Sequence, residues 1–291
     1  MKQEEVQKTV RERYGKIANE STAGSCACGG PDPKLRISPC CGNAPAAVGE
    51  ISKKVGYSEE EIKAVPEGAN LGLGCGNPIA LASLKEGETV LDLGSGGGFD
   101  CFLASEKVGV KGKVIGVDMT AEMLDKAREN ARRGKYQNVE FRLGEIENLP
   151  VADNMVDAII SNCVINLSND KPRVFAEAFR VLKPGGRLMV SDIVVLKKLP
   201  EYIRESIDAY IGCVAGAITK TEYIKAIKAA GFEKVKIVSE DTYPLDLFLD
   251  DPTATSIMAD LKITSEQAKA LSASIASVKV QGIKPIQAVR I

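Results

Sequence analysis

Between residues 88 and 240 the chain alternates short apolar runs rich in β-branched residues with amphipathic stretches of helical spacing. Continuous apolar runs indicate strands buried on both faces, and the stretches between them indicate helices. The expected strands are Thr89–Leu93, Lys113–Asp118, Asn138–Arg142, Val156–Ser161, Arg187–Ile193 and Lys234–Val238. The expected helices are Phe99–Val108, Ala121–Arg133, Lys171–Val181, Tyr202–Gly212 and Glu222–Ala230. This alternation predicts an α/β fold with a doubly wound, mostly parallel sheet.

The two ends of the chain follow other patterns. An amphipathic helix over Glu4–Ala18 precedes an irregular stretch, Ser21–Gly49, that is rich in Gly, Pro, Ser and Cys, and a short capped helix follows at Ser58–Ala64. Near the C-terminus a helix is expected over 265–275, then a strand at either Ser277–Gln281 or Pro285–Arg290. We therefore expect an N-terminal helix and cysteine-rich loop (1–66), an α/β core (67–240) and a small C-terminal region with a helical cap (241–291).

The charge balance excludes several classes of partner. Lys and Arg total 38 against 39 Asp and Glu, so no basic field attracts nucleic acid or an anionic membrane. The first residues lack the apolar stretch of a signal peptide, and no run reaches about 18 apolar residues. We expect a cytoplasmic protein whose cysteines stay reduced. Histidine is absent, which removes the commonest general base and nitrogen ligand.

A glycine loop, Gly94–Gly98, lies between the first strand of the core and the next helix. Glycine lets the backbone come close to a ligand, and the helix that follows offers unpaired amides. Asp118 closes the next strand, where a carboxylate can accept hydrogen bonds from both ribose hydroxyls. Phe99 takes the last glycine position of a dinucleotide motif, and Asp92 before the loop would repel a pyrophosphate. The pattern therefore favours a cationic adenosyl ligand.

These motifs resemble those of class I S-adenosylmethionine methyltransferases, which have a Rossmann-like fold. The resemblance implies that Gly94, Ser95 and Gly96 approach the methionine part of the cofactor and that Asp118 holds its ribose. It places Met119 beside the adenine, although Met119 and Ile146 are equally consistent with core packing. The full set of cofactor residues that it implies is Asp92, Gly94, Ser95, Gly96, Asp118, Met119, Glu145, Ile146 and Asn162.

The eight cysteines fall into three groups. Cys101 lies among apolar residues of a helix, where a thiol behaves as a small hydrophobe. Cys75, Cys163 and Cys213 lie in loops or at element ends, and Cys163 directly follows the fourth strand, at the edge where open α/β sheets bind ligands. The early group suits either a four-thiolate zinc site, without the paired C-x-x-C knuckles, or a substrate-binding loop. It consists of Cys26, Cys28, Cys40 and Cys41.

The segments around the second group, Asn70–Pro78, Ser161–Leu167 and Gly212–Ala217, resemble arsenite S-adenosylmethionine methyltransferases. The resemblance implies that Cys75, Cys163 and Cys213 carry trivalent arsenic, with Cys40 or Cys41 as a further functional cysteine. Thiolates suit such a thiophilic centre, whose lone pair can attack a methyl group without a general base. The expected acceptor is arsenite, free or as a thiol conjugate, or methylarsenite, and thioredoxin or glutathione would reduce the cysteines after turnover.

Two other functions remain open on the sequence. The first is methyl transfer to a small organic acceptor, such as a quinone precursor or a sterol, with incidental cysteines. The second is a thiol-based metal or redox sensor that has kept a vestigial cofactor fold. Intact Asp92, glycine loop and Asp118 favour an enzyme over the sensor.

Overall fold

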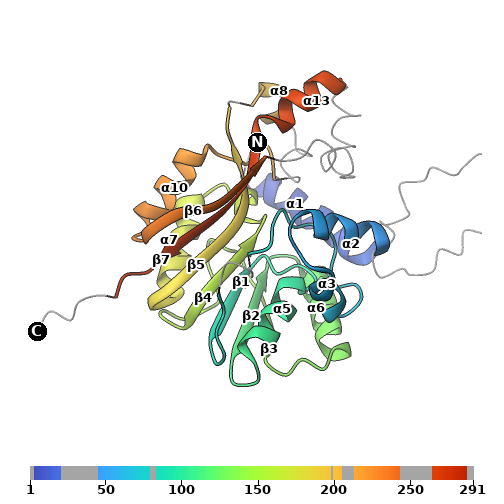
Figure 1. Cartoon of the computed structure of the whole chain (residues 1–291), viewed down its shortest axis with the longest axis vertical. Helices are drawn as coiled ribbons and strands as arrows, with labels where there is room; N and C mark the ends of the chain where they lie inside the picture. The colour runs from blue at the N-terminus through green and yellow to red at the C-terminus, as the bar shows by residue number, and fades with distance from the viewer. Residues whose placement is uncertain are drawn as a thin grey trace, which may run out of the picture.

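One seven-stranded sheet, in the order β3-β2-β1-β4-β5-β7-β6, organises the part of the chain that the computed structural model describes (Figure 1). The described residues are 3–20, 45–78, 83–197, 199–204, 213–242 and 264–286. The first five strands are mutually parallel, as the sequence predicts. They are β1 (Thr89–Leu93), β2 (Lys113–Asp118), β3 (Val139–Leu143), β4 (Val156–Asn162) and β5 (Leu182–Val195). The predicted α/β class is confirmed.

The last strand of the chain lies inside the sheet. β7 (Ile275–Ile283) pairs antiparallel with both β5 and β6 (Glu233–Thr242), which decides between the two expected positions in favour of Ser277–Gln281. Helix α13 (Ser265–Ser272) ends before the expected residue 275 because Ile275 already pairs with Val195. β7, which follows the expected boundary at residue 240, is thus part of the same sheet as β5 and β6.

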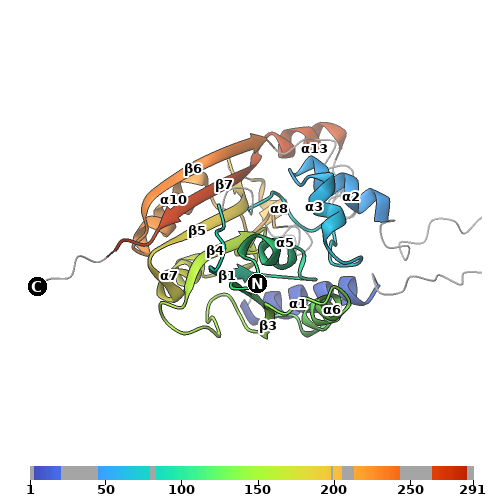
Figure 2. The same ribbon diagram turned by 60° about the horizontal axis from the view of Figure 1, so that its bottom comes forward.

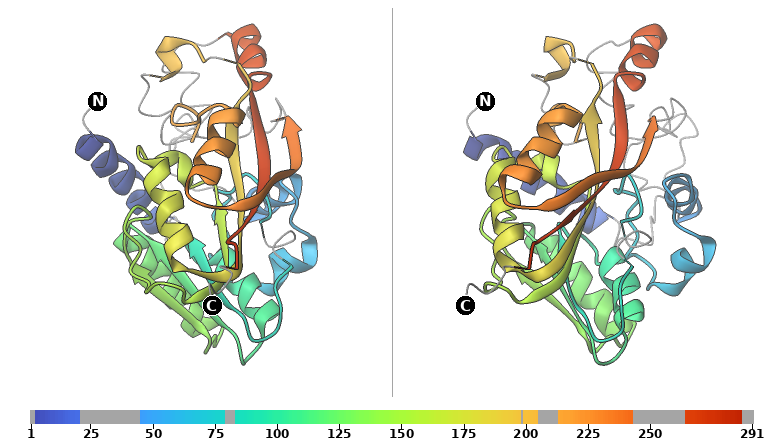
Figure 3. Two further views of the ribbon diagram at one scale, coloured as in Figure 1. Left: turned by 90° about the vertical axis from the view of Figure 1, so that its left-hand side faces the viewer. Right: turned by 60° about the vertical axis from the view of Figure 1, so that its left-hand side comes forward.

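Helices cover both faces of the sheet (Figures 1 and 3). Because side chains alternate along a strand, Leu91 faces one core with Phe175, whereas Val90 faces the other with Phe102. The helices of the first face are α7 (Lys171–Val181) and α10 (Lys220–Ala229), and those of the second are α5 (Phe99–Val108) and α6 (Ala121–Arg133).

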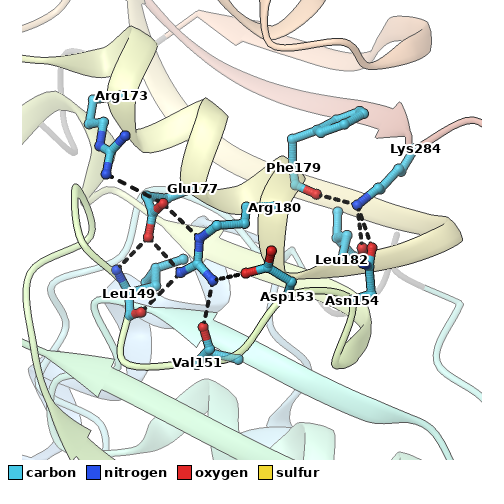
Figure 4. A network of polar contacts seen from close by, with 10 residues as sticks. All are labelled: Leu149, Val151, Asp153, Asn154, Arg173, Glu177, Phe179, Arg180, Leu182 and Lys284. Carbon is cyan, nitrogen blue, oxygen red and sulfur yellow. Dashed lines mark hydrogen bonds and ion pairs between the residues drawn. The ribbon is translucent and has the colours of Figure 1, made fainter.

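A polar network ties α7 to the loop that follows β3 (Figure 4). The Glu177 carboxylate, with its side chain 4% exposed, accepts from the Leu149 amide at 2.8 Å and from the Arg180 guanidinium at 2.7 and 2.8 Å. Arg180 also donates to the carbonyls of Leu149 and Val151. The network holds the loop 144–150, which carries two candidate cofactor residues, at a constant position beside the carboxyl edge of the sheet.

The N-terminal elements depart in one place from expectation. Helix α1 (Gln3–Glu20) lies along α6 (Figure 2), and α3 (Glu59–Ala64) has the expected capping box at Ser58. Residues 45–49, expected to be irregular, instead begin helix α2 (Pro45–Lys54). The four early cysteines lie outside the described residues.

Helix α8 (Glu201–Arg204) matches only the start of the expected helix 202–212, and the rest of that expected helix lies outside the described residues. Among the described helices, none has the length and apolarity that crossing a membrane requires.

Candidate active site

A cavity lies at the carboxyl ends of β1, β2 and β4, the edge where doubly wound sheets bind ligands. The segment before β1, including Ala69 and Gly74, forms another wall, and α1 contributes Gln7 and Tyr14. Most of the candidate residues therefore meet in one place. Those that line the cavity are Asp92, Gly94, Ser95, Gly96, Asp118, Met119, Ile146, Asn162 and Cys163.

The glycine loop has backbone conformations that other residues rarely adopt. Gly94 and Gly96 have φ values of +71° and +49°. A Cβ atom on Gly94 would lie 2.5 Å from the Val164 side chain, whereas one on Gly96 would have no atom within 4 Å. The Ser95 hydroxyl is buried and, within the described residues, has no hydrogen-bond partner. A buried hydroxyl of this kind is suited to a polar group of a bound ligand.

Asp118 organises the loop and keeps room for a ligand. Its Oδ2 accepts from the Gly96 amide and its Oδ1 from the Thr120 amide, each at 2.9 Å. The Thr120 side chain and the Met119 backbone also form hydrogen bonds with this carboxylate, and the partly exposed Asp118 lines the cavity. Glu145, in contrast, pairs its carboxylate with Arg11 of α1 at 3.2 Å and is not part of the cavity lining. Glu145 thus lies at the edge of the site.

Three carboxylates line the cavity: those of Asp92 and Asp100 are buried, and that of Asp118 is partly buried. Burial, followed by the charges of Asp100 and Asp118, raises the pKa of Asp92 well above its usual value. Burial likewise raises the pKa of Asp100 to about 6 and that of Asp118 above its ordinary value. A bound cation would stabilise the ionised forms. The donor set therefore fits a positively charged adenosyl ligand and would repel a pyrophosphate.

The structure brings together the three cysteines that the sequence singles out. Cys75 and Cys163 form a disulfide, and the Cys213 thiol donates to the Cys163 carbonyl at 2.9 Å. All three are buried in one apolar cluster with Leu167. Cys163 and Cys213 have left-handed backbones, with φ of +54° and +61°. Cys163 also lines the cavity, so the thiol cluster adjoins the candidate cofactor site.

Asn162 links the cofactor cavity to the Cys75 loop. Its Oδ1 accepts from the Cys75 amide at 3.0 Å. Its Nδ2 lies within hydrogen-bond distance of the Tyr57 hydroxyl, the Gly76 carbonyl and an Asp100 carboxylate oxygen, at 2.8, 2.7 and 3.2 Å. The Nδ2 hydrogens are already satisfied by the protein. Asn162 is therefore placed to position the cysteine loop relative to the carboxylates.

Another buried carboxylate, that of Asp192 on β5, lies close to the sulfurs of Cys75 and Cys163. Its Oδ1 accepts from the Asn166 amide group and its Oδ2 from the Tyr223 hydroxyl, at 2.9 and 3.0 Å. Burial raises the pKa of Asp192 to about 7. An oxygen of Asp192 and the sulfurs of Cys75 and Cys163 all lie within 4.8 Å of one another.

The chain is similar in sequence to known methyltransferases. Residues 84–231 match a family model described as a methyltransferase domain. The chain is 51% identical over 241 residues to the arsenite methyltransferase of Halobacterium salinarum, covering 82% of this chain and 60% of that protein. It is 33% identical over 286 residues to the arsenite methyltransferase of Aquipseudomonas alcaligenes, covering 95% of this chain and 73% of that protein. The chain belongs to the arsenite methyltransferase family.

A solved structure agrees with this arsenite methyltransferase assignment. The crystal structure of an arsenic(III) S-adenosylmethionine methyltransferase from Chlamydomonas reinhardtii matches with a TM-score of 0.60 and 32% identity, covering 84% of this chain and 76% of that chain. The resemblance that the sequence predicts is confirmed, as is the class I methyltransferase fold. The chain spans 60% of the length of the Halobacterium relative.

Three residues at this candidate site are not predicted by any sequence motif. Asp100 is in the first turn of the helix after the glycine loop, so a second carboxylate beside a cation site was a usable indication. Asp192 is the single carboxylate in an expected strand that is mostly apolar, which also indicates a special role. Tyr57 has no local indication, because only tertiary packing brings its hydroxyl to Asp100 at 2.7 Å.

Proposed function

We propose that the protein transfers the methyl group of S-adenosylmethionine to trivalent arsenic held by the thiolates of Cys75, Cys163 and Cys213. The observation that carries the proposal is the position of Cys163, which lines the cavity of the glycine loop and adjoins both other cysteines. Membership of the arsenite methyltransferase family supports the same reaction. The proposed acceptor is arsenite or methylarsenite, free or as a thiol conjugate.

The cavity residues divide the work of cofactor binding. When bound, S-adenosylmethionine supplies an electrophilic methyl group on a positively charged sulfur. Asp92 provides negative charge near that end of the cavity, and the Ser95 hydroxyl has an unused hydrogen-bonding capacity. Asp118 would accept from the ribose hydroxyls, while Met119 and Ile146 offer apolar contact to the adenine. Each of these residues lines the cavity.

The acceptor chemistry explains why no base is needed. Three thiolates hold arsenic(III) in a pyramid whose lone pair points away from the sulfurs. That lone pair carries no proton, so attack on the methyl group requires no proton transfer, in keeping with a chain that lacks histidine. The protein contributes alignment, which can lower a barrier by up to about 7 to 11 kcal/mol.

The cysteines also supply electrons. Methyl transfer formally oxidises arsenic(III) to arsenic(V), and two thiols that close to a disulfide return the two electrons. Cys75 and Cys163 are arranged to form that disulfide. We propose that thioredoxin or glutathione, the thiol systems of the cytoplasm, reopens it before the next arsenite binds. Cys40 or Cys41 would serve as the further functional cysteine.

Asn162→Ala is expected to lower kcat at least about tenfold while changing the Kd of S-adenosylmethionine less than about threefold. The substitution frees the Cys75 amide and the Tyr57 hydroxyl, so the cysteine loop loses its fixed position. Steady-state kinetics and calorimetric titration separate the two effects. Asn154→Ala, which removes an amide that accepts from Lys284 away from the cavity, is the control. An equal loss in cofactor affinity would show instead that Asn162 binds the cofactor directly.

The proposal is tested by incubating the purified full chain with arsenite, S-adenosylmethionine and either glutathione or the thioredoxin system. Chromatography coupled to arsenic detection should find methylated arsenicals, and thiol labelling after a single turnover without reductant should find a new disulfide. Methylation of a quinone precursor or a sterol, with none of arsenite, would favour the organic acceptor. Binding of the cofactor without turnover under any thiol condition would favour the sensor.

A further inference from the structure

The thiol cluster adjoins a buried carboxylate, that of Asp192, which has no role in the proposed methylation. The sulfurs of Cys75 and Cys163 and a carboxylate oxygen of Asp192 lie within 4.8 Å of one another, and all three residues are buried. Two thiolates and a carboxylate are a donor set that zinc-like cations accept in four-coordinate sites. The sulfurs form a disulfide here, so the site exists only after reduction.

The carboxylate of Asp192 is held in place as metal ligands usually are. Asn166 Nδ2 and the Ile193 amide donate to Oδ1, each at 2.9 Å, and the Tyr223 hydroxyl donates to Oδ2 at 3.0 Å. These hydrogen bonds, together with one from the Asn166 backbone, orient the carboxylate. Outer hydrogen bonds of this kind orient ligands and raise metal affinity.

The surrounding charge also suits a dication. Two thiolates and one carboxylate carry three negative charges, which a divalent cation reduces to one. The buried Lys171, whose ammonium donates to the Ser168 carbonyl at 2.9 Å, interacts electrostatically with Asp192. The whole assembly would then be close to neutral, which lowers the cost of burying it.

We propose that Cys75, Cys163 and Asp192 bind a thiophilic divalent cation of the zinc class in the reduced protein, and that this cation excludes arsenite. A phosphine reductant opens the disulfide by taking up one oxygen from water, which leaves two thiols and the phosphine oxide. The cation then displaces both thiol protons to solvent. Exclusion of arsenite rests on the proposed function, because it assumes that Cys163 holds arsenic; cation binding does not rest on it.

Cobalt(II) titration of the phosphine-reduced full chain tests the binding. Cys26, Cys28, Cys40 and Cys41 are first replaced by serine, so that thiols outside the described residues give no signal. We expect one equivalent of cobalt to produce thiolate-to-cobalt charge-transfer absorption and the visible bands of a four-coordinate ion, both removed by zinc. Absence of these bands from the folded, reduced protein would overturn the proposal.

Two variants assign the ligands. Asp192→Asn should weaken cobalt binding at least about tenfold. Asp157→Asn, a carboxylate on β4 paired with Lys183, is the matched control and should leave it unchanged. Cys75→Ser should abolish the charge-transfer band of the second thiolate, which keeps the test decisive if the Asp192 variant fails to fold. If folded Asp192→Asn or folded Cys75→Ser binds cobalt with unchanged affinity, that residue is not a ligand and the proposal is contradicted.

Inhibition is measured separately. Zinc at concentrations that displace cobalt should suppress arsenite methylation by at least about tenfold, and a chelator should restore it. If the protein methylates no arsenite at all, the proposed function fails while the cobalt titration still decides the cation site. Full activity with zinc bound would overturn the exclusion of arsenite.

Discussion

Cys163→Ser is expected to reduce arsenite methylation about a thousandfold, which corresponds to about 4 kcal/mol of transition-state stabilisation. A serine hydroxyl has almost the size of the thiol but is a poor ligand for a thiophilic centre. Cys163 lines the cofactor cavity and contacts both other cysteines. Its loss therefore removes the proposed arsenic ligand that adjoins the cofactor. Methylated arsenic is measured per enzyme under saturating arsenite and cofactor.

The control for this variant is Cys101→Ser. Cys101 is also buried, but its thiol donates to Asp92 from helix α5, and a serine hydroxyl can make the same hydrogen bond. We expect it to retain activity within about threefold. Cofactor affinity of Cys163→Ser should also stay near that of the wild type. A Cys163→Ser enzyme of ordinary activity would instead support an organic acceptor.

Asp118→Ala is expected to raise the Kd of S-adenosylmethionine about a hundredfold, or about 3 kcal/mol, because hydrogen bonds to a charged acceptor contribute about 1.5 to 3 kcal/mol each. The substitution removes the proposed ribose acceptor and leaves the Gly96 and Thr120 amides without theirs, so the loop also loses its order. Calorimetric titration of the cofactor measures the change.

Asp118→Asn is the graded comparison, because it keeps one acceptor oxygen and should give an intermediate Kd. Arsenite binding to the reduced protein should be nearly the same in both variants, since the proposed arsenic ligands are thiolates and Asp118 supplies none. A cofactor Kd within about twofold of the wild type in Asp118→Ala would show that the ribose is held elsewhere.

Local sequence patterns predict the architecture and the cofactor end of the candidate site. The apolar runs placed β1, β2 and β4 within a residue of their observed bounds, because a strand buried on both faces needs an uninterrupted apolar pattern. The glycine loop and Asp118 were equally readable, since they are local motifs attached to strand ends. The three candidate cysteines were singled out by their positions in loops and at element ends and by the resemblance, and the fold brings them together.

The contacts between these parts can be seen only in the folded protein. Asn162 reaches the Cys75 amide across 87 residues, and Ser277 donates to the Cys75 carbonyl across 202. The same holds for β7, whose insertion between β5 and β6 depends on pairing partners far along the chain. Local patterns encode which residues are buried, because burial follows from each segment's own periodicity. Which buried groups meet is set by packing between distant segments, and no local pattern records it.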